Sequence, residues 1–421
     1  MNTVSKNTDN AAIVAADGTP LKKKLAQAMF RSRLRAAGLV LPLFGFVLAS
    51  FVIPIFALMW QGVYNDTFER LMPETTIQLA AWDGESEPTE VMYAALVADL
   101  IVARKDKTAG KVGSRVNQQL SGARSLFTGT ARKAHKLKPP FKESVIKTKS
   151  KWADIEYWQA MKLTSDSLTP GFYASSVDKT LTVTGDFVAV DENRQIYVKL
   201  FIRTFLISGS VMLMCLILGY PVAYLLATLP LKTSNFLMIM VLLPFWTSLL
   251  VRTTAWIAIL QSQGVINDLL VWVGIASDDG RFSLIYNMTG TIVAMTHILL
   301  PFMILPLYSV MKTIPPSYMR AARSLGATPT VAFIKIYMPQ TIPGVGAGGL
   351  LVFILAIGYY ITPALVGGQD GQLISNMIAY HMQKSLNWSL AAALGGILLG
   401  CVLLLYWAYD RVIGIDNMKL G

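Results

Sequence analysis

The stretch from Pro315 to Gly344 reads PPSYMRAARSLGATPTVAFIKIYMPQTIPG and decides the fold. It is polar and basic, and it lies between two apolar segments. Pro316 or Ser317 can start a helix, because Pro is tolerated in the first helical turn. Gly326 suits the left-handed backbone conformation that ends a helix. The first half of the stretch therefore predicts a short helix that ends at Gly326.

The second half of the stretch carries its own start and stop signals. Thr328 can cap a helix through its side chain, and Pro329 suits the first helical position. Pro339 is expected to stop this second helix. The sequence thus predicts two short helices with a sharp joint between them. Ala321 and Ala322 leave the first helix thin enough for close packing in a groove.

The composition of the chain is that of a membrane protein. Hydrophobic residues make up 53% of it and charged residues only 15%, whereas about a quarter of a soluble domain is charged. A membrane-spanning helix needs about 20 apolar residues. Arg252 and His297 are the only basic side chains well inside the qualifying segments, which contain no Asp or Glu. The predicted fold class is an all-α membrane protein with spans at about 36–60, 203–229, 234–260, 286–311, 344–366 and 387–409.

Basic residues predict the orientation. Residues 1–35 form a basic segment, in which residues 21–35 hold six Lys or Arg and no acid. Such a run beside the first span places the N-terminus in the cytoplasm. The segment lacks the features of a signal peptide, so the first span is expected to stay as an anchor. Its first 20 residues are expected to be disordered. Counting spans places loop 230–233, loop 312–343 and the tail 410–421 in the cytoplasm as well.

The same count places residues 61–202 outside, in the periplasm of a cell that has one. Within this insertion, residues 102–151 hold 14 Lys or Arg against two acids, a net charge of +12. Long loops are translocated largely regardless of charge. Residues 181–198 alternate and turn at a Gly-Asp pair, which predicts a hairpin, and residues 91–103 read as helical. We expect a partly ordered insertion of mixed structure.

The quoted stretch also carries a spacing motif. Arg320-Ala321-Ala322 is followed by Gly326, and nine residues later by Ile336-Tyr337-Met338-Pro339. This resembles the "EAA" loop with which permease subunits of bacterial ABC importers dock on their ATPase. The family often has Glu at the place of Arg320 and Leu at that of Met338, so the ion pair of that Glu is not carried over. The resemblance implies an ATPase contact through Ser317, Arg320, Ala321, Ala322, Arg323, Leu325, Gly326, Ile336 and Pro339.

From about Lys199 onward the chain is similar to permeases of the spermidine/putrescine type, whereas residues 66–198 match nothing in that family. The resemblance implies the type I importer fold, and a bacterial inner-membrane assembly of two permease subunits, often different, with an ATPase dimer and a periplasmic binding protein. The matching segments are Gly219–Tyr224, Leu243–Ser248, Val251–Thr253, Ala255–Trp256, Leu300–Met303 and Thr362–Gly368.

No enzyme activity is predicted for the chain. It lacks the G-x-x-x-x-G-K-[ST] pattern, so ATP and Mg²⁺ are expected on the partner ATPase, and no cofactor or metal on this chain. His135, His297 and His381 form no catalytic pattern with paired acids, and Cys215 and Cys401 read as small buried hydrophobes. An ion-gradient-driven secondary transporter is the alternative, although such proteins usually need carboxylates inside their spans. Nucleic acid is not an expected partner.

Charged and aromatic groups in the spans are candidates for the solute pathway. A charge there usually faces an interior or a water-filled cavity, but Arg252 can also reach the outer interface or bind carbonyls. His297 is either an interior hydrogen-bonding group or a proton carrier. Aromatic residues can equally pack in the core or at the membrane interface. The candidates are Arg252, Trp246, Trp256, His297, Tyr359, Tyr360 and Thr362, with Pro221, Pro244, Pro301, Pro306 and Pro363 as interruptions of the spans.

The fifth span bears on the solute. Polyamine permeases often have an acid in a Gly-acid-aromatic-x-Thr-Pro stretch, but here Tyr359 takes the acid's place between Gly358 and Tyr360. We therefore hypothesise that the solute is a zwitterion or an anion, for example an amino-acid derivative or an opine-like molecule, unless a partner permease supplies the acid. The basic segment 102–151 suggests a binding-protein contact or a contact with anionic membrane lipid. A solvated insertion without a role in transport is the third interpretation of that segment.

Overall fold

The computed structural model describes residues 21–413, so the predictions for residues 1–20 and for most of the tail lie outside the described residues. The chain divides into two compact units, residues 1–60 and 61–421, which are described separately. The predicted helical fold with six spans is confirmed, because six helices among the described residues are long and apolar enough to cross a membrane. They are Ser32–Gln61, Tyr197–Thr228, Leu249–Trp272, Met288–Thr313, Pro329–Gly358 and Trp388–Arg411.

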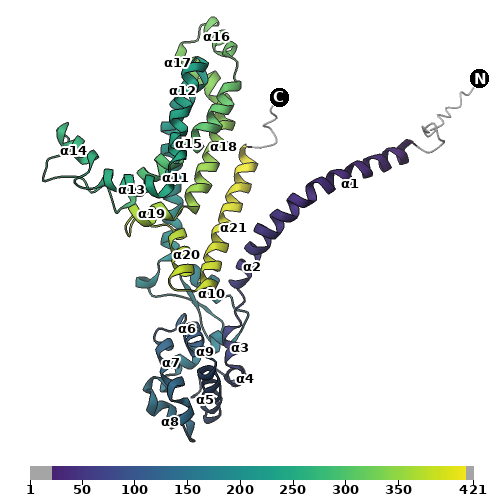
Figure 1. The fold of residues 1–421 in the computed structure, drawn as a ribbon, viewed down its shortest axis with the longest axis vertical. Helices are drawn as coiled ribbons and strands as arrows, with labels where there is room; N and C mark the ends of the chain where they lie inside the picture. The colour runs from purple at the N-terminus through teal and green to yellow at the C-terminus, as the bar shows by residue number, and fades with distance from the viewer. Residues whose placement is uncertain (1–20, 414–421) are drawn as a thin grey trace, which may run out of the picture. The chain divides into compact units, whose positions relative to one another are not determined.

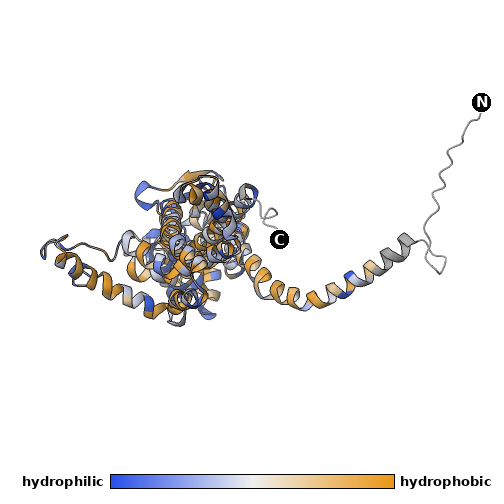
Figure 2. Ribbon diagram, turned by 90° about the horizontal axis from the view of Figure 1, so that it is seen from above, coloured by the Kyte–Doolittle hydropathy of each residue, from blue (hydrophilic) through white to orange (hydrophobic). Residues whose placement is uncertain are grey.

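The first unit is one long helix. α1 (Leu21–Val47) continues through a π-helical turn (Leu48–Val52) into α2 (Ile53–Gln61). Apolar residues predominate toward its end, as Figure 2 shows, and none of the apolar stretch is buried within the chain. An apolar helix of this length fits contact with lipid.

The insertion is a compact helical domain, not the partly ordered segment that the sequence suggested (Figure 1). Trp152 and Trp158 are fully buried at its centre, with their rings 5.9 Å apart. The Trp152 indole donates to the Thr130 hydroxyl over 2.8 Å, and Tyr93 donates to the Trp152 carbonyl over 2.7 Å. The helices are α3 (Thr67–Leu71), α4 (Pro73–Ala81), α5 (Glu90–Lys105), α6 (Ala109–Asn117), α7 (Ala123–Lys133), α8 (Phe141–Thr148), α9 (Ile155–Ser165) and α10 (Gly171–Ser176).

The predicted hairpin is confirmed and leads into the next span. Strands β1 (Lys179–Leu181) and β2 (Phe187–Ala189) pair antiparallel, and Gly185 turns between them with φ +91°. Asp178 then caps the following helix, because its carboxylate accepts from the backbone N–H groups of residues 196, 197 and 198 over 2.8–3.0 Å. This cap fixes where the helix begins.

Three long helices form the centre of the apolar bundle: α11 (Tyr197–Thr228), α15 (Met288–Thr313) and α18 (Met338–Gly358) (Figure 1). The backbones of α15 and α18 approach closely at Gly348. A Cβ atom there would lie 2.9 Å from the sulfur of Met303 and 3.1 Å from its carbonyl oxygen. Small residues permit such contacts between membrane helices. α21 (Trp388–Ile413) completes the core at its insertion end, against α10 and α20 (Ile374–Gln383).

The prediction of one continuous span over residues 234–260 is wrong, because the helix is broken within this range. α12 (Leu231–Leu242) passes into a 3₁₀ turn (Leu243–Trp246), the chain is extended at Thr247, and α13 (Leu249–Leu260) begins anew. Pro244 has no N–H to donate, and Ser248 starts α13 by accepting from the Val251 N–H over 3.2 Å. The crossing helix in this region is instead α13 together with α14 (Val265–Trp272).

The expected fifth span, residues 344–366, is also interrupted. α18 ends at Gly358, and the short α19 (Ile361–Val366) begins after Tyr359 and Tyr360. Among the five prolines expected to interrupt spans, only Pro244 and Pro363 lie at breaks. Pro221, Pro301 and Pro306 lie inside continuous helices.

The compact insertion gives a direct stability prediction. Trp152→Ala removes the central side chain, and we expect a loss of about 3–5 kcal/mol because the site is fully buried. Protease cleavage of the insertion in the full-length protein should then accelerate by more than about 100-fold. Ile77→Ala, at a position 62% exposed, is the control and should leave the rate nearly unchanged. Equal rates in both variants would show that the aromatic centre does not stabilise the insertion.

Candidate coupling loop and translocation pathway

The first helix of the loop, α16 (Pro316–Ser324), ends as predicted. Gly326 has φ +90°, in the left-handed region. The Gly326 N–H donates to the Arg323 carbonyl over 3.0 Å and the Ala327 N–H to that of Ala322 over 3.1 Å. This pair of bonds is the Schellman motif, which satisfies the last carbonyls of a helix.

The second helix starts where the sequence predicts but does not stop at Pro339. Thr328 caps α17 (Pro329–Ala332), with its hydroxyl accepting from the Val331 N–H over 3.4 Å. A π-helical turn (Phe333–Tyr337) then joins α17 directly to α18. This wider turn makes room for the Pro339 ring, which falls in the first turn of α18. α17, the π-helical turn and α18 therefore form one continuous helix from residue 329 to 358.

Aromatic rings fix the base of the loop to α11. The ring of Tyr224 makes edge contacts with Phe333 and with Tyr337, each at 5.3 Å between centroids. The Tyr220 hydroxyl lies 3.0 Å from the Thr341 hydroxyl. The base of the loop is therefore packed against α11 and continuous with α18.

The tip of the loop is exposed. Leu325 is 90% exposed and Tyr318 50% exposed, although both are large apolar residues. Arg320 and Arg323 are exposed too, and neither has a carboxylate partner within the described part of the chain. Of the predicted coupling residues only Ala322 is partly covered. An exposed apolar tip with free cations on a rigid support is typical of a docking surface.

Several predicted pathway residues lie together where α13, α15 and the α18–α19 break meet. The Trp256 indole donates to His297 Nδ1 over 3.1 Å, so the neutral ring carries its proton on Nε2. Thr253 and Thr362 bring α13 and α19 together, with their hydroxyls 3.3 Å apart. Arg252 lies within electrostatic range of His297. Its buried Nε has no hydrogen-bond partner among the described residues.

Tyr359 and Tyr360 form the break itself. Ser375 donates to the Tyr359 carbonyl over 2.6 Å, and the Asn376 amide donates to the Tyr360 carbonyl over 2.8 Å. Trp246 is 77% exposed at the end of its 3₁₀ turn, and within residues 21–413 it makes no hydrogen bond or ring contact with the other candidates. Sequence reasoning missed Ser375 and Asn376, although two polar residues beside an apolar helix were a usable signal.

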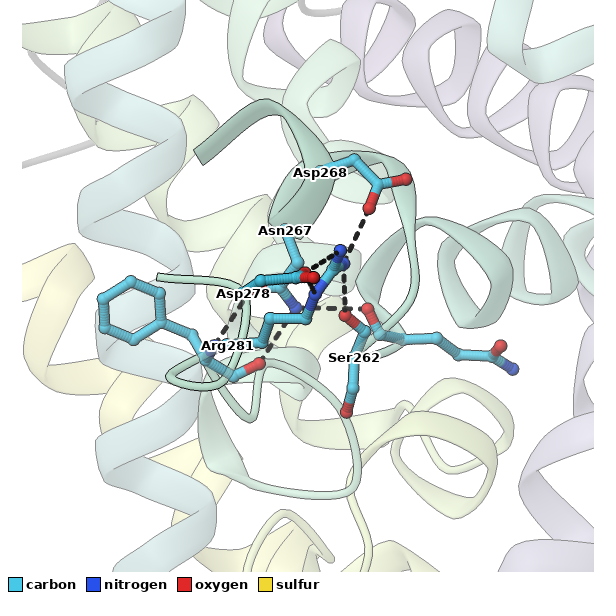
Figure 3. Close-up of polar contacts among 7 residues, drawn as sticks. Ser262, Asn267, Asp268, Asp278 and Arg281 are labelled. Carbon is cyan, nitrogen blue, oxygen red and sulfur yellow. Dashed lines mark hydrogen bonds and ion pairs between the residues drawn. The ribbon is translucent and has the colours of Figure 1, made fainter. Parts of the chain in front are cut away.

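A polar cluster that the sequence did not reveal holds the connection between α14 and α15 (Figure 3). Arg281 pairs with Asp268 at 2.6 Å and with Asp278 at 2.8 Å, and it donates to the Ser262 carbonyl over 3.0 Å. The Asn267 side chain donates to the Phe282 carbonyl and accepts from the Phe282 N–H, each over 3.0 Å. These bonds close the loop between the third and fourth crossing helices.

Within residues 21–413, six helices long and apolar enough to cross a membrane define a multi-pass membrane protein. Residues 217–413 match the family described as binding-protein-dependent transport system inner membrane component. The spermidine/putrescine transport system permease protein PotB of Escherichia coli (strain K12) is 37% identical over 204 residues, which cover 48% of this chain and 74% of PotB. The chain belongs to this permease family.

Two further permease proteins are similar to this chain. PotB of Haemophilus influenzae is 33% identical over 53% of this chain and 78% of its own length. The inner membrane ABC transporter permease protein YdcU of Escherichia coli is 32% identical over 257 residues, which cover 58% of this chain and 80% of YdcU. A solved bacterial alginate ABC transporter, in complex with an alginate pentasaccharide-bound periplasmic protein, covers 53% of this chain and 80% of its own at 18% identity and a TM-score of 0.42. The protein is an inner-membrane permease subunit of a binding-protein-dependent importer, and a secondary transporter is not favoured.

The joint at Gly326 gives a test of the loop's structure. No atom lies within 4 Å of a Cβ built at Gly326, so Gly326→Ala acts through backbone strain alone, about 1–2 kcal/mol. Hydrogen exchange of the amides at residues 320–327 should accelerate by about 5- to 30-fold. Gly400→Ala is the control, with equal space but an ordinary helical backbone. Unchanged exchange in Gly326→Ala would contradict the left-handed cap.

Proposed function

We propose that this permease forms one half of a translocation pathway and is driven by a separate ATPase dimer, which binds the ATP and Mg²⁺. The exposed Leu325 at the end of α16, next to a helix that packs on α11 and continues into α18, carries this proposal. A second permease subunit, different from this one, completes the pathway, and a periplasmic binding protein delivers the solute. The resemblance to the docking loop of ABC importer permeases supports the predicted coupling residues as the ATPase contact.

We place both termini and loop 312–343 in the cytoplasm and the insertion 61–202 in the periplasm. The basic segment before the first crossing helix supports this orientation. The core 203–409 then carries the pathway. The chain itself hydrolyses no ATP in this proposal, and its described residues hold no cluster of His, Cys, Asp or Glu that could bind a metal.

A polyamine-class cation is the first candidate solute, because the relatives at 37% and 33% identity are named for spermidine and putrescine. A zwitterionic or anionic solute is the second candidate, favoured by the unpaired Nε of Arg252 beside His297 and by Tyr359 in place of an acid. Tyrosine rings and hydroxyls at the break can contact either class, by cation–π contact or by hydrogen bonds.

One reconstitution tests the proposed function. The permease pair, its ATPase and its binding protein are placed in proteoliposomes, and ATP hydrolysis is measured with spermidine, putrescine, a zwitterionic amino-acid derivative and an opine-like acid. We expect stimulation by the polyamine-loaded binding protein, and at least a tenfold loss of that stimulation in Leu325→Asp. The control Ile77→Asp, on the exposed surface of the insertion, should keep full stimulation.

The outcomes separate the two parts of the proposal. Stimulation only by the zwitterion or the acid would assign the second solute class and leave the coupling intact. Hydrolysis that ignores the binding protein with every solute, or that survives Leu325→Asp unchanged, would overturn the coupling role.

A further inference from the structure

A cavity of about 1190 Å³ opens where the insertion meets the ends of the crossing helices. Its walls come from the segment before α3, from α6, and from residues 384–390 between α20 and α21. Tyr197 and Trp388 also line it, and they are the first residues of two candidate spans. Aromatic residues at span ends lie at the level of the lipid headgroups. The cavity therefore lies at the membrane interface.

The cavity is strongly basic. Its one acid, Asp66, is already paired with Arg70 at 3.5 Å. Within residues 21–413, none of its cations has a carboxylate within 4.0 Å. These cations are Lys107, Lys111, Arg115, Arg124 and Lys384.

Arg115 is the least expected of these cations, because it is only 2% exposed. Its Nη1 donates to the Gln118 side chain over 3.2 Å, and its guanidinium carbon lies 4.7 Å from the ring centroid of Phe172. Nε and Nη2 are covered by protein atoms and have no hydrogen-bond partner in the described chain. Burial lowers the pKa of Arg115 to about 10, so the group is still charged at neutral pH. A buried charge without a counter-ion is destabilising, because nothing offsets the hydration that it loses.

Several neutral polar groups of the cavity are hydrogen-bonded to one another. The Tyr197 hydroxyl lies 2.9 Å from His381 Nε2, and His381 Nδ1 lies 2.8 Å from the Ser385 hydroxyl. The Asn65 amide donates to the Ser389 hydroxyl over 2.9 Å. The groups left for a ligand are therefore the cations.

We propose that this cavity binds a phosphate-class oxyanion, supplied by the headgroup of an anionic membrane lipid. The oxyanion accepts hydrogen bonds from the exposed Lys111 and Arg124 and offsets the charge of Arg115 at the wall. The position of Tyr197 and Trp388 favours a lipid over free phosphate as the source. The bound lipid joins the insertion to the span ends, and the proposal does not depend on which side of the membrane the insertion lies.

The full-length protein in neutral detergent is titrated with short-chain phosphatidylglycerol, short-chain phosphatidylcholine or inorganic phosphate, and its unfolding temperature is followed. Phosphatidylglycerol should raise that temperature in a saturable way. The midpoint of this titration should shift at least tenfold to higher concentration in Lys111→Ala/Arg124→Ala and in Arg115→Met. Arg132→Ala/Lys133→Ala removes the same charges from exposed positions outside the cavity and should keep the wild-type midpoint.

The double variant Lys111→Ala/Arg124→Ala changes only exposed side chains, so we expect it to fold. It therefore still tests the proposal if Arg115→Met fails to fold. A saturable rise with inorganic phosphate, lost in the same variant, would support the oxyanion site with free phosphate as its source. An equal response to phosphatidylcholine, or an equal loss in the control pair, would overturn the proposal. A fourth titration uses the cognate binding protein. Stabilisation by that protein and by none of the other three ligands would overturn the proposal and would assign the cavity to acidic side chains of that protein.

Discussion

Backbone carbonyls freed inside an apolar bundle are the constraint on which this structure depends. Within a bilayer, an unbonded carbonyl costs several kcal/mol, so a helix can break only where protein groups take over its bonds. Ser375 and Asn376 do this for the carbonyls of Tyr359 and Tyr360. The Thr204 hydroxyl in turn accepts from the Ile374 N–H over 2.8 Å, which anchors α20 on α11. The irregular backbone of the fifth span is thus stabilised by hydrogen bonds from α20.

This arrangement links the break to the exposed loop through one stiff element. α18 runs from the π-turn at the loop to Gly358 beside the break, and its close contact with Met303 at Gly348 holds it against α15. The rings of Tyr224 and Phe333 hold the loop's base. The base of the loop, α11, α15 and α18 are therefore packed together, and packed helices transmit strain. Such a connection is what an importer needs between its motor and its pathway.

Local signals in the sequence predicted the loop well. The left-handed Gly326 and the Thr328 cap depend on nearest neighbours, and both are confirmed. Pro339 was misjudged, because the π-turn that accommodates it depends on packing against Tyr224. The order within the insertion was missed, because the net charge of +12 over residues 102–151 suggested a solvated segment, whereas the Trp and Tyr residues of the core come from separate elements. The sequence indicated only part of the pathway cluster. Ser375 and Asn376 were missed because each donates a hydrogen bond to a carbonyl 16 positions away in the chain.

Cross-linking from the loop tip tests the central claim most directly. A single cysteine is placed by Leu325→Cys in a Cys401→Ala background, in which Cys215 stays buried, and the assembled importer is treated with a short cross-linker with and without ATP. The account predicts a product between this permease and the ATPase whose yield changes with nucleotide. A cysteine at exposed Lys147 in the insertion should give none. A product with the ATPase from Lys147→Cys and not from Leu325→Cys would contradict the account.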